Sequence, residues 1–561
     1  MRRGKKILWV VFISFILFLD VLICINIYFF RSAEKEKNAE KKIRILEKAN
    51  KFYPLNDLIY WEIGKNYYEL GLEKLEDRIR GEQYFSKSIH NFRKSIKLNP
   101  ASYFVHFNLA HALFYRSILN PSLKDDFLEE YKKTILLAGQ NDEIYYEVGK
   151  FLFSQWPKLS EDDRKFTLDV CKRIDFLRER ERLRTFLNIW DLNIKDYKVI
   201  RKIIPESPQV YREYAQFLGE KALSLKERQE ILALADFLEF EKAKKDFQLG
   251  EKEFYYYRYK KAGAYFDSCL KRLERIKFYQ KLTHQSLISL AEFNEIRKFS
   301  LLNLAKCRIE EGDDFQGVEN LLRRFLWHEE KVGEINKLED YLIRRGLLNE
   351  DLTSDFEDLN KLSFKLFLYF KQSRYTDILK AGNIFQRSFY LISEDRKGKI
   401  VEVLTYFGDS CQKMDRLFDA EEFYKKALEL EPDNLEVLLR IRKTYERLNE
   451  EMKIKEVERR IEKILTPKEA FSGDSMIYRG KVFNFRLMLD GRRGTLNLQF
   501  KEDCCRDMTP VITVFFNGEI IWEDSLKAPF LSVSFDSNIG MNTVEVESLG
   551  FPVSLLKLTY E

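Results

Sequence analysis

The sequence contains few of the residues that build metal centres or disulfide frameworks. Its 561 residues include only five histidines, and these are too dispersed for a recognisable metal site: His90, His106, His111, His284 and His328. The seven cysteines are scattered and odd in number, unlike a disulfide framework: Cys24, Cys171, Cys269, Cys307, Cys411, Cys504 and Cys505. We therefore expect no metal, no cofactor and no disulfide scaffold.

Catalytic motifs and a strong net charge are also missing. The sequence has no phosphate-binding GxxxxGKS/T loop, no HExxH, no CxxC and no GxSxG nucleophile elbow. The net charge of +6 is small for this length, and no dense Lys/Arg block with interleaved aromatics lies outside the N-terminal tail. We expect the protein neither to be an enzyme nor to bind nucleic acid.

A long apolar run is present near the N-terminus. It extends from Ile7 to Phe30 and slightly exceeds the ~20 apolar residues that cross a bilayer as a helix. The apolar core of a cleaved signal peptide is shorter, about 7–15 residues. Basic residues favour the cytoplasmic side of a membrane, and four precede the run: Arg2, Arg3, Lys5 and Lys6. This pattern predicts a signal anchor in the plasma membrane, with residues 1–6 as a cytoplasmic tail, residues 7–30 as a single transmembrane helix, and the bulk of the chain extracytoplasmic.

Two polar residues interrupt this predicted transmembrane helix. Asp20 and Asn26 are costly in hydrocarbon, and they could pair with the helix of another membrane protein. Alternatively, a single-pass helix tolerates one Asp, and Asn26 lies near the membrane interface.

The stretch from residue 33 to residue 467 is helical in pattern and contains internal repeats. The clearest unit begins at Leu404, continues through the segment AEEFYKKALELEPDN, and starts again 34 residues later at Leu438. Small residues at Gly408, Ala420 and Ala427 would let two antiparallel helices approach closely, with Tyr424 between them. The spacing resembles the tetratricopeptide repeat (TPR) family. The resemblance implies a right-handed superhelix of helical hairpins with a concave groove that binds protein partners.

The predicted solenoid is regular at its two ends and degenerate at 155–195 and 326–400. Its first hairpin is about a dozen residues longer than the family pattern between Gly71 and Ser88, which predicts an inserted loop at 72–87.

After Pro467 the sequence pattern changes from helical to strand-like. Alternation of period two begins near Tyr478, and Asn517-Gly518 is a strong signal for a two-residue hairpin turn. The spacing predicts about seven strands in a β-sandwich over 474–561, similar to the jelly-roll modules of surface proteins. The expected fold class is mainly α: a transmembrane helix, a TPR-like α-solenoid and a C-terminal all-β sandwich.

A predicted binding groove lies on the first helices of three N-terminal hairpins. On each helix, the residue after the leading large side chain and the residue seven positions later face the same way. These positions give two rows of rings: Trp61, Phe107 and Tyr146 in one row, and Tyr68, Phe114 and Phe153 in the other. Basic side chains lie between the rows: Lys65, His111 and Lys150. Such a surface suits an extended ligand with apolar groups and negative charge. The alternative is that the rings pack against a neighbouring helix or against the inserted loop at 72–87.

A second candidate site is the hairpin around Asn517. Counting across its turn places Phe515 opposite Ile520, and Phe515 and Trp522 on one face, where the two rings could bind a sugar. The alternative is that the solenoid covers this face.

Together these features predict a membrane-anchored scaffold that binds a protein partner in the cell envelope. The alternative function is a glycan-binding accessory protein of surface-polysaccharide assembly or export.

Overall fold

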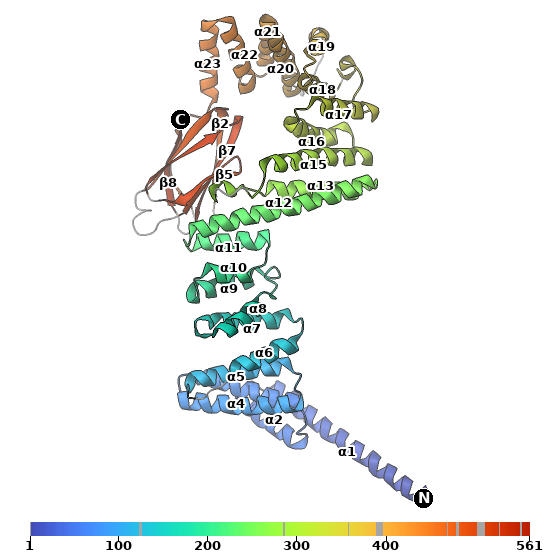
Figure 1. The fold of residues 1–561 in the computed structure, drawn as a ribbon, viewed down its shortest axis with the longest axis vertical. Helices are drawn as coiled ribbons and strands as arrows, with labels where there is room; N and C mark the ends of the chain where they lie inside the picture. Colours follow the sequence, from blue (N-terminus) through green and yellow to red (C-terminus); the bar gives the residue numbers. More distant parts are fainter. Residues whose placement is uncertain are drawn as a thin grey trace. The chain divides into compact units, whose positions relative to one another are not determined.

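The structure is a computed structural model that describes residues 2–122, 126–283, 287–356, 358–388, 397–467, 469–477, 482–501, 511–526, 528–549 and 553–561. Cys504, Cys505 and His284 lie outside these ranges. The chain forms two compact units, an N-terminal unit (Met1–Pro205) and a C-terminal unit (Glu206–Glu561). Figure 1 shows the elements of both units.

The N-terminal unit is entirely helical in its described residues. Its elements are α1 (Arg2–Glu34), α2 (Ala39–Phe52), α3 (Asp57–Glu73), α4 (Arg78–Leu98), α5 (Tyr103–Leu119), α6 (Phe127–Ala138), α7 (Asp142–Ser154), η1 (Trp156–Lys158), α8 (Glu161–Cys171), α9 (Arg180–Asn193) and α10 (Tyr197–Ile203).

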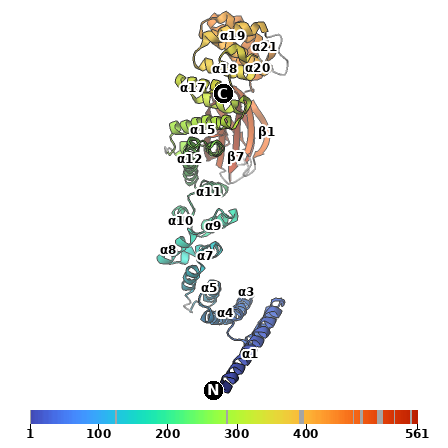
Figure 2. The same ribbon diagram turned by 90° about the vertical axis from the view of Figure 1, so that its right-hand side faces the viewer.

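Among the described residues, α1 is the one helix that is long and apolar enough to cross a membrane. The qualifying segment contains 23 residues, Phe12–Glu34. An 18-residue stretch of it has a mean hydropathy of 2.4, and 6% of that stretch is buried. Two views show that the N-terminal part of α1 extends beyond α2 and α3 (Figure 1 and Figure 2). Its length and composition therefore agree with the predicted transmembrane helix.

The C-terminal unit begins with an array of helices. They are α11 (Pro208–Glu220), α12 (Leu225–Tyr255), α13 (Tyr259–Glu274), α14 (Gln280–Thr283), α15 (Leu290–Glu311), α16 (Phe315–His328), α17 (Val332–Arg344), η2 (Leu352–Asp355), α18 (Leu359–Lys371), α19 (Tyr375–Ser388), α20 (Lys397–Lys413), α21 (Leu417–Leu430), α22 (Leu435–Leu448) and α23 (Glu451–Ile464).

Glycines on first helices and aromatic rings on second helices hold the hairpins together. An alanine Cβ at Gly408 of α20 would lie 2.5 Å from Tyr424 of α21, and a Cβ at Gly64 of α3 would lie 2.7 Å from Phe92 of α4. Tyr424 is buried, and its hydroxyl donates to Asp409 at 2.6 Å. The expected role of Gly408 in close helix approach, with Tyr424 filling the space, is confirmed.

The predicted insertion at 72–87 is not a loop. The extra residues lengthen both helices of the first hairpin, because α3 continues to Glu73 and α4 begins at Arg78. Gly71 still packs against Phe85 of α4, where an added Cβ would lie 2.8 Å from the ring. The hairpin contact therefore continues through the stretch that the sequence pattern assigned to a loop.

The C-terminal β domain consists of two four-stranded antiparallel sheets. The strands are β1 (Glu469–Ile477), β2 (Val482–Asp490), β3 (Arg493–Phe500), β4 (Val511–Phe516), β5 (Glu519–Ser525), β6 (Phe530–Asp536), β7 (Ile539–Leu549) and β8 (Val553–Tyr560). The strand orders are β1-β8-β3-β6 and β2-β7-β4-β5, which is the order of a jelly roll. Side chains of both sheets form one hydrophobic core. The predicted all-β C-terminus is confirmed, although it starts at Glu469 instead of 474 and has eight described strands instead of about seven.

The predicted hairpin turn is also confirmed. Asn517 and Gly518 both have positive φ angles, 50° and 80°, as a two-residue type I′ turn requires. The register beyond the turn differs from simple counting. A bulge between Val514 and Phe515 pairs Trp522 with Val514, although Phe515 still pairs with Ile520.

Candidate functional site

The six rings of the predicted N-terminal groove lie on α3, α5 and α7, but none of them is exposed. Phe114 and Phe153 are buried, with Phe153 at 0% exposure. The other four are partly buried: Trp61, Tyr68, Phe107 and Tyr146. The prediction that these rings form an open ladder is therefore wrong for Phe114 and Phe153, because neighbouring side chains enclose both.

Trp61 packs against the next hairpin. Its ring meets Phe104 of α5 edge-on, with 5.2 Å between the ring centroids. The Lys65 ammonium lies 5.7 Å from the centroid of the Trp61 ring. Trp61 therefore fills the space between successive first helices and does not stand in an open channel.

His111 lies at the centre of an aromatic cluster. Its ring is 4.5 Å from Phe107, 5.1 Å from Phe151 and 6.5 Å from Tyr68, measured between centroids. Burial, followed by the nearby Lys150 charge, lowers the pKa of His111 to about 4. The imidazole is therefore neutral near pH 7 and cannot supply the positive charge expected of it there.

Tyr146 and Phe153 pack against α9. The Arg182 guanidinium lies 4.7 Å from the Tyr146 ring centroid, and the Lys150 ammonium lies 5.0 Å from it. Phe153 is 5.3 Å from Phe186, measured between centroids. The structure thus brings Tyr68, Phe107 and His111 together, but it places Trp61, Tyr146 and Phe153 in separate contacts between helices. A binding role for these residues stays a prediction.

The predicted sugar platform on the β domain is not open. Phe515 is buried, and Trp522 is partly buried against the core of the sandwich. The bulge next to Phe515 shifts the register of β5, which explains why the two rings do not form the expected shared face.

The face of β4 that points away from the sandwich core is covered by helix α12 of the same unit. Arg228 of α12 forms an ion pair with Glu523 of β5, and both side chains are buried. Thr513 of β4 donates to the same carboxylate at 2.9 Å, and the Gln229 side chain donates to the Glu523 carbonyl at 3.2 Å. The alternative in which the solenoid covers this face is therefore the one that the structure shows.

An open groove lies elsewhere in the C-terminal unit, on helices α16, α18, α20 and α22. It consists of two adjoining hollows of about 390 and 1030 Å³. Four residues line both hollows: Trp327, Asn434, Glu436 and Arg440. The larger hollow continues to the β domain at Met488 of β2 and Ile539 of β7. We call this surface the Trp327 groove.

Apolar rings line the smaller hollow of the Trp327 groove. Trp327 is 75% exposed at its edge, whereas Phe367 is buried and Tyr406 partly buried in its wall. The Tyr406 hydroxyl is protonated at neutral pH, and burial raises its pKa further. The hollow therefore offers an apolar surface together with a hydroxyl group.

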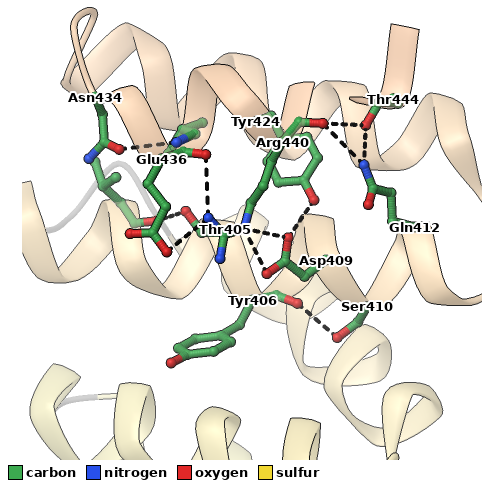
Figure 3. Close-up of polar contacts among 12 residues, drawn as sticks. Thr405, Tyr406, Asp409, Ser410, Gln412, Tyr424, Asn434, Glu436, Arg440 and Thr444 are labelled. Atoms are coloured by element: carbon green, nitrogen blue, oxygen red, sulfur yellow. Dashed lines mark hydrogen bonds and ion pairs between the residues drawn. The ribbon is translucent and has the colours of Figure 1, made fainter. Parts of the chain in front are cut away.

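Ion pairs fix the charged groups of the smaller hollow. Arg440 Nε lies 2.9 Å from Asp409, and Arg440 Nη1 lies 2.8 Å from Glu436 (Figure 3). In the same hollow, Arg323 Nη1 lies 2.8 Å from Glu402. Each cation of this hollow is thus matched by a carboxylate, and its lining carries no net charge. A charge-balanced lining does not favour a polyanion.

The sequence interpretation missed this groove, although one signal was available. Leu322, Phe325 and Leu326 follow helical core spacing and are buried. Trp327 comes next, lies off that apolar stripe and is exposed. Rings that continue the core pattern are expected to be buried, whereas a large ring outside that pattern is expected to be exposed. In the residues that the structure describes, no group of three or more His, Cys, Asp or Glu side chains could hold a metal ion.

Comparisons with known proteins identify no family for this chain. No family model matches the sequence, and no curated protein matches it. Solved structures align over much of the chain at low similarity. The structure of Naa15/Naa10 bound to HypK-THB matches 77% of this chain and 62% of that chain, with 13% identity and a TM-score of 0.22. The TPR domain of P58(IPK) matches 69% of this chain and 99% of that chain, with 12% identity and a TM-score of 0.16. Yeast Tom70 matches 76% of this chain and 96% of that chain, with 11% identity and a TM-score of 0.17. Scores this low carry no functional argument, so the interpretation depends on the geometry of the chain itself.

Proposed function

We propose that this protein is a membrane-anchored, non-enzymatic scaffold that holds an extended segment of a protein partner in the Trp327 groove. The observation that carries the proposal is the composition of the groove, in which an exposed tryptophan and further rings lie beside ion-paired arginines. A polypeptide offers apolar side chains, backbone hydrogen-bonding groups and charges of both signs, which match such a lining. Stacked helical hairpins commonly use a continuous concave surface for this kind of binding.

The paired charges of the smaller hollow favour a protein partner over an anionic polysaccharide. An anionic polysaccharide would need unpaired cations, but Arg323 and Arg440 of the smaller hollow each have carboxylate partners within 3 Å. In the larger hollow, Lys443 is accompanied by Asp433. The rings expected to stack on a sugar, Phe515 and Trp522, are not exposed. These observations support a protein partner over a glycan.

The anchoring part of the proposal depends on α1. Its apolar segment and the basic residues before Ile7 support a single-pass helix with its N-terminus in the cytoplasm and the remaining chain on the outer side of the plasma membrane. The expected result is that the protein stays in the membrane pellet after alkaline and high-salt washes. Release of a soluble chain that begins near Ala33 would instead show a cleaved signal.

The groove is tested by co-purification from detergent-solubilised membranes. Trp327→Ala should lose a defined protein partner that the unmodified chain retains. Phe418→Ala is the matched control, because Phe418 lies at the start of α21 and is exposed to a similar extent, 73%. Retention of the partner by Trp327→Ala would contradict the proposal, and co-purification of polysaccharide that depends on Trp327 would favour the glycan-binding alternative.

A further inference from the structure

The turn between α2 and α3 carries a cluster of exposed apolar side chains. Leu55 is 65% exposed, and Phe52 and Leu58 on either side of it are also exposed. These three apolar side chains lie within seven residues and form a surface that water solvates poorly. This turn belongs to the same compact unit as α1.

Specific contacts fix the turn against α1. The side-chain amide of Asn26 in α1 donates to the carbonyl of Ala49 at 3.2 Å, and Asn56 donates to the Asn26 side-chain oxygen at 2.9 Å. The Phe29 and Phe52 rings stack with 5.8 Å between centroids and 11° between planes. Residues 52–58 are therefore held at the level of residues 26–29 of the membrane helix. These contacts also explain why Asn26 is tolerated, because its polar atoms are satisfied by α2 and Asn56.

The length of α1 places this level at the membrane boundary. The helix rises about 1.5 Å per residue, so the distance along α1 from Ile7 to Asn26 is about 28 Å. The hydrocarbon core of a bilayer is about 30 Å thick. With the basic residues before Ile7 in one headgroup layer, Asn26 and Phe29 reach the opposite boundary between hydrocarbon and headgroups.

We propose that the α2–α3 turn is a second membrane contact, in which Phe52, Leu55 and Leu58 insert into the lipid interface beside the anchor. The inference depends on the proposed membrane span of α1. Apolar side chains at this depth gain free energy by leaving water, as in interfacial helices that bury one face at the boundary between headgroups and acyl chains. Lys51 is exposed beside Phe52, and its ammonium can remain among the headgroups. The turn and the anchor would together restrict tilting of the first hairpin relative to the membrane.

The proposal is tested by depth-dependent fluorescence quenching on the full-length protein in lipid nanodiscs. Leu55→Cys is labelled with an environment-sensitive fluorophore in a background in which Cys24, Cys504 and Cys505 are replaced by serine. The four remaining cysteines are buried and should not react. Quenching is compared between lipids with a nitroxide near the headgroup and lipids with a nitroxide in the middle of the acyl chain.

Two further positions calibrate the measurement. Phe15→Cys, within the apolar part of α1, should be quenched most by the mid-chain nitroxide. Leu136→Cys is the matched control, because Leu136 of α6 is an exposed leucine at 81%, and it should be quenched by neither lipid. The proposal predicts a blue-shifted emission at Leu55 and stronger quenching by the headgroup-proximal nitroxide than by the mid-chain one.

The outcomes separate this proposal from the anchor on which it depends. If Phe15 is quenched while Leu55 behaves like Leu136, the helix spans the membrane and the turn is not inserted, which overturns the inference. If Phe15 is not quenched, the proposed membrane span itself is wrong, and the inference fails with it.

Discussion

Replacing Gly408 by alanine is expected to weaken the α20–α21 hairpin. The new Cβ would lie 2.5 Å from Cε1 of Tyr424, a separation that real Cβ contacts do not show. Tyr424 cannot move easily, because its ring is fully buried and its hydroxyl is bonded to Asp409. Overpacking of this kind costs about 1–3 kcal/mol. Because about 1.4 kcal/mol corresponds to a factor of ten, amide exchange that requires local opening should accelerate by roughly 5- to 150-fold.

Gly263→Ala is the matched control for this experiment. Gly263 lies in the second turn of α13, where an added Cβ would meet Cys307 at an ordinary contact distance of 3.5 Å. Removing a glycine from a helix interior there should stabilise the protein by about 0.5–1 kcal/mol. Native-state hydrogen exchange followed by mass spectrometry reports on each hairpin separately. Unchanged or slower exchange of α20 and α21 in Gly408→Ala would refute the packing argument.

Three more predictions concern buried groups. Arg228→Met should leave Glu523 as an unpaired buried charge and destabilise the contact between α12 and the β domain by about 3–5 kcal/mol. Amide exchange in β4 and β5 should then be faster. Unchanged exchange would contradict the buried ion pair. Phe153→Ala should cost about 3–5 kcal/mol and lower the Tm, whereas Leu136→Ala should leave the Tm unchanged; equal Tm values would mean that Phe153 is not a packing residue. Burial lowers the pKa of His111 to about 4 in the folded state, against 6.5 in the unfolded state. Because the unfolded state binds the proton more readily, the contribution of His111 to stability is complete above about pH 6.5 and is lost as the pH falls towards 4. Thermal unfolding at several pH values should show that His111→Phe reduces this acid sensitivity, and an identical pH dependence would contradict the buried, neutral imidazole.

Local rules predicted much of the fold from the sequence. The 34-residue spacing and the pairing of Gly408 with Tyr424 depend on contacts between sequence neighbours, which the repeat pattern specifies directly. The two-residue turn at Asn517-Gly518 follows from backbone preferences of those two residues alone. The bulge beside Phe515 has no comparable sequence signal, and it changed the face assigned to Trp522.

The candidate sites were harder to predict because they depend on non-local packing. Helical spacing alone suggested that Trp61, Phe114 and Phe153 line a groove. It could not show that Phe104, Phe151 and Phe186 from other turns and helices would pack against them. The Trp327 groove combines Arg323, Glu402 and Arg440, which belong to different hairpins. Only the folded array brings them together.

The central claim, that the Trp327 groove holds a protein partner, is tested most directly by site-specific photo-crosslinking in native membranes. A photoreactive amino acid replaces Trp327 in the full-length protein, and the same amino acid replaces Phe418 in the control. We predict a discrete protein adduct from position 327, with the crosslinked peptide mapping to one extended segment of the partner, and no such adduct from position 418. Equal adducts from the two positions, or no protein adduct from position 327, would contradict the proposed function.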